Sequence, residues 1–372
     1  MGAKIWKMTK RVLLSLLGLI VGLIGAGLGY RAYWQHQSAK AMVIDRSSGI
    51  DEGMFVKIGG IDQWVTIRGQ DRNNPVLLMV HGGPGVTMCP TARTSLSWER
   101  DFTIVQWDQR GAGKTFGRSG PLDPTVTIDQ MAQDGVEVAE FLRRQLHKQR
   151  VTLVGVSWGT ILGIHMAKAR PELFCAYVGT GQFVNTRQGQ ALGYAQLLAE
   201  VSASGDRRAI RALEVIGPPP YHSLSELGVH TNWALAHEAG APSTLGILSA
   251  VFFAPGSTLW DFRDWMAGLM TSQNHFYGET MSGPIMAVDL PAFSTDFAIP
   301  MFVFQGADDN IAPAKLARAY IDRIRAPHKE LVLITGAGHV AIVTKSNEFL
   351  SLLVQRARPL AIQAEQTTRS PR

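Results

Sequence analysis

Residues 151–163 read VTLVGVSWGTILG and hold one serine, Ser157, between Gly155 and Gly159. The apolar run before the serine is typical of a buried strand, and the run after it has the spacing of a helix. A sharp strand-to-helix turn at G-x-S-x-G presents a serine hydroxyl for nucleophilic attack. Larger side chains beside the serine would collide with the strand and the helix, so the two glycines fit this turn.

Short apolar runs alternate with amphipathic helical patterns along most of the chain. Runs 54–58 and 63–67 predict a hairpin, with Gly59 and Gly60 near its turn. Six further runs are almost wholly apolar, as in strands covered on both faces, and lie at 75–80, 102–107, 151–156, 174–179, 301–306 and 330–335. The alternation predicts an α/β domain over residues 50–358, with a mainly parallel sheet between layers of helices.

Two segments depart from this alternation. Helical patterns replace strands over residues 186–295, which predicts a helical cap inserted between the sixth and seventh strands. The tail, residues 359–372, is polar and is expected to be disordered.

The N-terminal segment predicts a membrane anchor. Residues 12–30 carry no charge, and about 20 apolar residues span a bilayer as a helix. Aromatic residues flank the run, and four cations precede it, which places residues 1–34 as a cytoplasmic tail and transmembrane anchor with the remaining chain outside the cytoplasm. A cleaved signal peptide, giving a secreted protein, is the alternative. The length of the span favours the anchor, and so does the poor match of the residues after the run to a signal-peptide cleavage site.

Composition narrows the function classes. The net charge of the 372 residues is +6, but the cations gather at the two ends, so no basic face for nucleic acid is expected. Cys89 and Cys175 could form a disulfide, although two separate thiols are favoured in a chain large enough to bury its own core. The sequence has no cluster with metal-ligand spacing, so neither a metal nor a cofactor is expected. The oligomeric state is left open.

A reactive serine requires a histidine base that is held by a carboxylate. In a sheet of this kind, both should follow the serine, acid first, on loops at the C-terminal ends of strands. The loop after strand 301–306 offers Asp308 and Asp309. His339 follows strand 330–335, whereas His328 lies before it, at the wrong edge of the sheet.

Backbone N–H groups should stabilise the oxyanion that forms when the serine attacks a carbonyl. Trp158 follows the serine at the start of the helix, so its N–H is one predicted donor. The loop after the third strand reads HGGPG, and the N–H of Gly83 is the second. His81 lies on this loop, away from the base position, and is expected to form structural hydrogen bonds.

Five motifs together resemble the proline iminopeptidase family of α/β-hydrolases: HGGPG at 81–85, WDQRGAGKT at 107–115, GVSWGT at 155–160, GADD at 306–309 and GAGH at 336–339. The resemblance implies an α/β-hydrolase fold and a serine peptidase that removes an N-terminal residue, often proline. It assigns Ser157 as nucleophile, His339 as base and Asp309, rather than its neighbour, as acid.

The chain also differs from that family, whose members are usually soluble and hold the substrate amine with carboxylates of the cap. Five cap glutamates are present, but none aligns with a family motif: Glu200, Glu214, Glu226, Glu238 and Glu279. An esterase or amidase for small apolar acyl groups is therefore one alternative, and a non-catalytic binding protein is another. The cap aromatics could line an acyl pocket or form the core of the cap, and are Phe252, Phe253, Trp260, Trp265, Phe276 and Tyr277.

Overall fold

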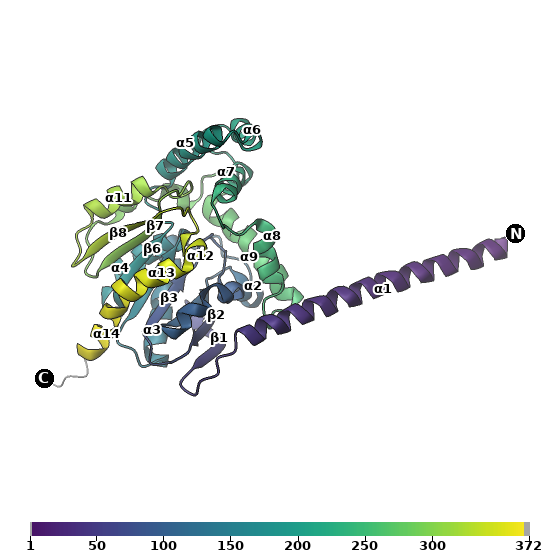
Figure 1. The fold of residues 1–372 in the computed structure, drawn as a ribbon, viewed down its shortest axis with the longest axis horizontal. Coiled ribbons are helices and arrows are strands. Elements are labelled where there is room, and N and C mark those ends of the chain that lie inside the picture. The colour runs from purple at the N-terminus through teal and green to yellow at the C-terminus, as the bar shows by residue number, and fades with distance from the viewer. Residues whose placement is uncertain (1, 368–372) are drawn as a thin grey trace.

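The computed structural model describes residues 2–367, which fold around one eight-stranded sheet (Figure 1). The strands are β1 (Ile50–Ile58), β2 (Ile61–Gly69), β3 (Val76–Val80), β4 (Thr103–Asp108), β5 (Val151–Val156), β6 (Phe174–Thr180), β7 (Met301–Gly306) and β8 (Lys329–Ile334). Their order across the sheet is β1-β2-β4-β3-β5-β6-β7-β8. The predicted hairpin is confirmed, because β1 and β2 pair antiparallel, and the strands from β4 to β8 run parallel.

Helices cover both faces of this sheet. Neighbouring residues of β3 point to opposite sides, so Leu78 joins one apolar core and Leu77 joins the other. The helices of the central layers and their connections are α2 (Gly113–Ser119), α3 (Ile128–Gln145), α4 (Trp158–Ala169), α11 (Ala314–Arg323), α12 (Ala341–Thr344) and α13 (Ser346–Leu352). The mainly parallel α/β-hydrolase sheet that the sequence predicts is therefore confirmed.

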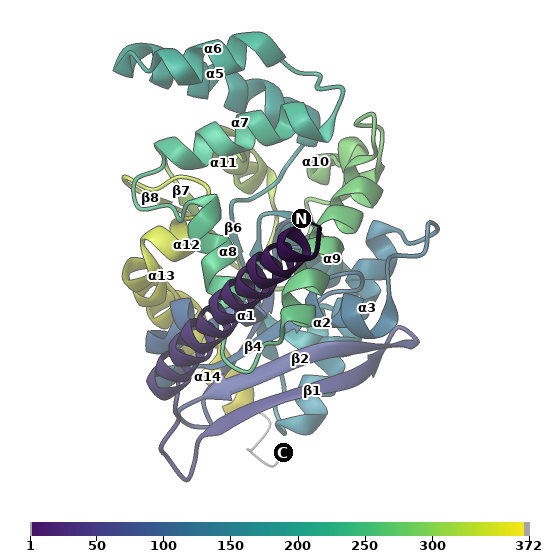
Figure 2. The same cartoon turned by 90° about the vertical axis from the view of Figure 1, so that its right-hand side faces the viewer.

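A run of helices separates β6 from β7. It comprises α5 (Thr186–Ser204), α6 (Arg207–Ile216), α7 (Leu224–His237), α8 (Thr244–Phe252), α9 (Leu259–Tyr277) and α10 (Leu290–Phe293). We call these helices and their connections the cap. Side chains of Asn185, Ser223, Ser243 and Thr258 accept hydrogen bonds from the first turns of α5, α7, α8 and α9, which accounts for where these helices begin. Figure 2 shows α5 and α6 farthest from the hairpin β1–β2.

The C-terminal segment differs from the sequence prediction. Residues that were expected to be disordered continue as helix α14 (Arg358–Thr367). Ala361 is buried, and the carboxylate of Glu365 accepts a hydrogen bond from the backbone of Gln149 at 2.8 Å. These contacts with the body of the protein stabilise a helix that polar composition alone did not reveal. Residues 368–372 lie outside the described part of the chain.

Helix α1 (Gly2–Ala41) projects from the domain (Figure 1). Among residues 2–367, it is the one helix long and apolar enough to cross a membrane, and a signal sequence would pass the same test. Its last turns pack on the cap. Arg31 donates to the carbonyl oxygens of Phe252 at 3.0 Å and Ser257 at 2.7 Å, and Gln35 donates to that of Ala254 at 2.8 Å.

Candidate active site

Ser157 occupies the sharp turn between β5 and α4. Its φ of 53° is unusual for a residue with a side chain, and such strain is common at functional sites. The flanking glycines are required by packing. A Cβ on Gly155 would lie 2.8 Å from the carbonyl oxygen of Gly159, and one on Gly159 would lie 2.0 Å from that of Val80. The turn therefore has the geometry expected from the sequence.

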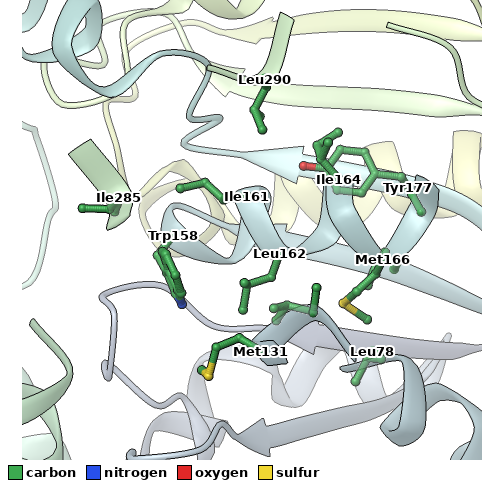
Figure 3. Close-up of a cluster of buried hydrophobic side chains, with 14 of the residues drawn as sticks. Leu78, Met131, Trp158, Ile161, Leu162, Ile164, Met166, Tyr177, Ile285 and Leu290 are labelled. Atoms are coloured by element: carbon green, nitrogen blue, oxygen red, sulfur yellow. The ribbon is translucent and has the colours of Figure 1, made fainter. Parts of the chain in front are cut away.

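The core below this turn holds α4 in place. Trp158, Ile161 and Leu162 of α4 pack among buried side chains that include Leu78 of β3 and Met131 of α3 (Figure 3). A rigid base of this kind fixes the direction in which the serine hydroxyl points.

Three side chains from separate loops meet in series. His339 Nε2 lies 2.9 Å from Ser157 Oγ, and His339 Nδ1 lies 3.0 Å from Asp309 Oδ2. Because the carboxylate faces Nδ1, the Nδ1–H donates to it, and Nε2 is left to accept the hydroxyl proton. His328 is mostly exposed and pairs with Glu330, outside this series.

Asp309 is fixed by the loop that carries it. The backbone N–H groups of Ile311 and Ala312 donate to its Oδ1, each at 2.8 Å, and Gln305 Nε2 donates to its Oδ2 at 2.7 Å. Asp308, in contrast, is exposed. The structure therefore selects between the two aspartates that residue spacing left open.

The charge of Asp309 alters the proton affinity of His339. Burial of the imidazole favours its neutral form, but the charge of Asp309 and its hydrogen bond outweigh that effect, so the pKa of His339 lies above its usual 6.5. Glu238 of the cap raises this pKa further through its charge. The ring is thus set to take up a proton during a reaction.

The HGGPG loop passes close to the serine. A Cβ on Gly82 would lie 3.1 Å from Ser157 Cβ, so a larger residue would press against the serine. Gly83 lines the same cavity as Ser157 and has a φ of 116°, which favours glycine. The sequence indicates Gly83 as the oxyanion donor, but it gives no sign that Gly82 lies against Ser157.

His81 has the structural role expected of it. The backbone N–H of Gln109 donates to His81 Nε2 at 3.3 Å, so the ring proton resides on Nδ1 and is donated to the carbonyl of Gly82 at 2.9 Å. Burial lowers the pKa of His81 to about 4. The same Gln109 accepts from the indole of Trp158 at 3.0 Å, which links this loop to the helix that follows the serine.

A cavity of about 920 Å³ extends from Ser157 and His339 between the sheet and the cap. Its walls are mainly apolar, and in the part of the chain that the structure describes no aspartate or glutamate lines it. Three residues of α1 line it as well: Tyr30, Trp34 and Ser38. No pattern in the sequence indicated that α1 forms part of this cavity wall.

The cap residues singled out from the sequence fall into two groups. The five glutamates lie outside the cavity lining, and Glu238 is the one that contacts the His339 loop. Phe253, Trp265 and Tyr277 line the cavity, whereas Phe276 packs against Trp158 with ring centroids 4.5 Å apart. These aromatics thus serve both expected purposes, whereas Trp260 is 67% exposed and lies outside the cavity lining.

Neither cysteine is part of the site. Cys89 and Cys175, both within the described residues, are free thiols. Burial raises the pKa of Cys175 to about 11, so its thiol stays protonated and unreactive.

The sheet topology, the strained serine turn and the joined Ser, His and Asp side chains define a hydrolase of the α/β class. The chain belongs to the alpha/beta hydrolase family, whose family profile matches residues 77–350. It is similar to a probable aminopeptidase, YbaC, of Bacillus subtilis (strain 168), with 28% identity over 82% of this chain and 95% of that protein. A probable proline iminopeptidase of Streptomyces coelicolor is 26% identical over 83% of this chain and 95% of that protein.

Solved structures share the fold. The crystal structure of a proline iminopeptidase from Mycobacterium smegmatis superposes with a TM-score of 0.59 at 20% identity, covering 84% of this chain and 100% of that one. The crystal structure of a membrane phospholipase A, a novel bacterial virulence factor, superposes with a TM-score of 0.57 at 15% identity. This match covers 94% of this chain and 99% of that one. The latter coverage exceeds what residues 50–372 can supply, so the shared fold includes part of the N-terminal region.

Proposed function

We propose that this chain is a membrane-anchored serine hydrolase that cleaves an ester or amide bond through an acyl-enzyme. The observation that carries the proposal is the 2.9 Å approach of Ser157 Oγ to His339 Nε2, on a ring whose other nitrogen faces Asp309. This series is the arrangement that activates a serine hydroxyl in hydrolases of several folds.

The reaction proceeds in two steps. Ser157 Oγ bonds to the substrate carbonyl carbon while His339 takes the hydroxyl proton, and the N–H groups of Gly83 and Trp158 stabilise the oxyanion. The tetrahedral intermediate then releases the amine or alcohol, which leaves with the proton from His339. Water attacks the acyl-serine by the same route, the acid is released, and Ser157 regains its proton. Asp309 orients the imidazole and stabilises its charged form.

The anchor is retained in this proposal. Arg31 and Gln35 bind backbone carbonyls of the cap, so the end of α1 is part of the folded domain. Cleavage within the apolar run would leave Arg31 and Gln35 attached to the domain but would cut them off from the N-terminal part of the same helix. The four cations before the run support an orientation with the N-terminus in the cytoplasm and the hydrolase domain on the outer side.

Two substrate classes follow from different observations. The names of the sequence relatives favour an aminopeptidase that releases an N-terminal residue such as proline, from a short peptide or small amide. The cavity favours an esterase or amidase for apolar acyl groups, because no carboxylate along the described lining could pair with a free amine. A charged amine enclosed without a counter-charge is strongly disfavoured.

A substrate panel separates these classes. The full chain in detergent micelles would be assayed on prolyl and N-acetylprolyl naphthylamides and on p-nitrophenyl butyrate, with Ser157→Ala as control. Preference for the free-amine substrate supports the aminopeptidase, and preference for the blocked amide or the ester supports the second class. If a fluorophosphonate probe fails to label the folded wild-type chain, the serine hydrolase proposal fails and a binding role replaces it.

A further inference from the structure

The cavity that holds Ser157 reaches the surface beside the anchor helix. Tyr30 and Trp34 of α1 line it while keeping 59% and 42% of their own surface exposed, so they lie at its entrance. Tyr30 is the last residue of the uncharged run, and Trp34 follows one turn later. In a helix whose apolar run spans a bilayer, rings at this point lie at the membrane interface.

Helix α8 of the cap lies on the side of the domain from which α1 projects (Figure 1), and residues of both line the cavity. The ring of Phe253, at the end of α8, meets that of Tyr30 edge to face with centroids 5.8 Å apart, and both residues line the cavity. Arg31 is not part of the cavity lining, and its hydrogen bonds fix α1 to the end of α8 and the loop that follows. The entrance is therefore held at one position relative to the membrane-spanning part of the helix.

The charged side chain at this entrance is a cation, and no carboxylate accompanies it along the described lining. Arg93 is the one lysine or arginine along the described lining. Arg93 as a whole residue is exposed, and its guanidinium donates to Ser38 Oγ of α1 at 3.0 Å in a partly buried hydrogen bond. A cation beside an apolar passage suits a molecule with an apolar chain and an anionic head group.

We infer that the substrate of this site is an acyl ester of the bilayer itself, a glycerophospholipid. Its acyl chain enters from the membrane past Tyr30 and Trp34, and its phosphate stays near Arg93. This inference rests on the proposed serine hydrolase. Ser157 takes the acyl group from the glycerol oxygen, the lysolipid leaves with the proton carried by His339, and water releases the fatty acid. Entry from the membrane avoids exposing the acyl chain to water, where every methylene adds to the cost.

Two matched variants test the route. Trp34→Asp puts a charge in the entrance, and Tyr33→Asp puts the same charge at the neighbouring aromatic position of α1, which does not line the cavity. The full chain would be reconstituted in vesicles of phosphatidylcholine and phosphatidylglycerol in equal parts. Fatty acid release from the vesicle lipid and hydrolysis of soluble p-nitrophenyl butyrate would be measured on the same samples.

The inference predicts that Trp34→Asp lowers release from vesicle lipid by about tenfold or more, because a charge opposes passage of the acyl chain. Any loss of butyrate hydrolysis in Trp34→Asp should be several-fold smaller than its loss of lipid release, because butyrate does not need the membrane route. Tyr33→Asp, outside the cavity lining, should leave both rates near those of the wild type. The inference is overturned if the wild type hydrolyses butyrate but releases no fatty acid, or if the two variants behave alike. If the wild type shows neither activity, labelling of the same sample by a fluorophosphonate probe separates the two proposals. A labelled chain overturns the lipid substrate alone, and an unlabelled folded chain refutes the underlying serine hydrolase.

Arg93 provides a second arm of the same experiment. With vesicles of either lipid alone, the wild type should prefer the anionic phosphatidylglycerol, and Arg93→Gln should reduce that preference. Lys40→Gln is the matched control, because Lys40 is an exposed cation of α1 outside the cavity lining. Equal effects of the two substitutions would show that general surface charge, and not a head-group contact, sets the preference.

Discussion

The carboxylate of Glu238, in the cap, accepts a hydrogen bond from the backbone N–H of Val340, the residue directly after His339, at 3.1 Å. The same carboxylate accepts from Thr344 Oγ1 at 3.3 Å. Burial raises the pKa of Glu238, although hydrogen bonds from the backbone oppose the shift. A cap carboxylate thus positions the loop that carries the candidate base.

Glu238→Gln should move the acid limb of the pH profile. His339 must be neutral to accept the serine proton, so kcat/KM falls as the pH drops through the pKa of His339. Glu238 is one of the charges that raise this pKa, so its removal should shift the limb to lower pH. The glutamine oxygen can still accept from Val340, and most of the activity at high pH should remain. Glu226→Gln, at a carboxylate that binds the backbone of His222 instead, should leave the profile unchanged.

Asp309→Asn should have a much larger effect. It removes the charge that most strongly raises the pKa of His339, so the acid limb should again move to lower pH. The backbone N–H groups of Ile311 and Ala312 would hold the amide oxygen at the Oδ1 position and leave the amide NH2 facing His339 Nδ1. The ring would then favour the wrong tautomer, and a loss of about 10³–10⁴-fold in kcat is expected. The adjacent, exposed Asp308 provides the control, since Asp308→Asn should change kcat by less than about twofold. Equal losses in the two variants would contradict the assignment.

Gly83→Ala tests the second oxyanion donor. The added Cβ would lie 2.6 Å from the backbone nitrogens of Gly85 and Val86, at a φ of 116°. Displacement of this loop should lower kcat by about 10²-fold or more. Gly189→Ala is the control. Gly189 lines the same cavity, but a Cβ added there would approach one atom only, at 3.9 Å. Thermal unfolding of both variants distinguishes a displaced donor from an unfolded domain, and an active Gly83→Ala would argue against this donor.

Arg31→Ala should destabilise the domain. Its guanidinium is largely buried and donates to two backbone carbonyls of the cap. Loss of hydrogen bonds from a charged donor costs about 1.5–3 kcal/mol, which should appear as a lower denaturation midpoint of the full chain in micelles. Lys40→Ala, at an exposed position of the same helix, should have no measurable effect. Equal stability of the two variants would mean that α1 contributes little to the fold.

The sequence predicted those features that follow from local pattern and strand order. Apolar runs located the eight strands, and the position of His339 after its strand brought it to the edge where Ser157 lies. Residue spacing could not choose between Asp308 and Asp309, because the choice depends on how the loop turns. The family resemblance selected the residue that contacts His339.

Other features depend on contacts between distant segments and had no local signal. In the sequence, Arg31 is the first charge after the apolar run, yet its partners Phe252 and Ser257 are more than 200 residues away along the chain. The tail helix α14 depends in the same way on contacts such as that of Glu365 with Gln149. Tertiary contacts of this type determine the structure without altering hydrophobic periodicity.

Helix α1 runs without interruption from the apolar run to its contacts on the cap. If the chain is anchored as proposed, no flexible linker lies between the span and the helix turns that contact the cap, so any tilt of the span would tilt the domain with it. A hydrophobic stretch that exceeds the local thickness of the hydrocarbon layer tilts to fit. The thickness of the host membrane would therefore set the angle and height at which the catalytic domain is presented to the lipid surface.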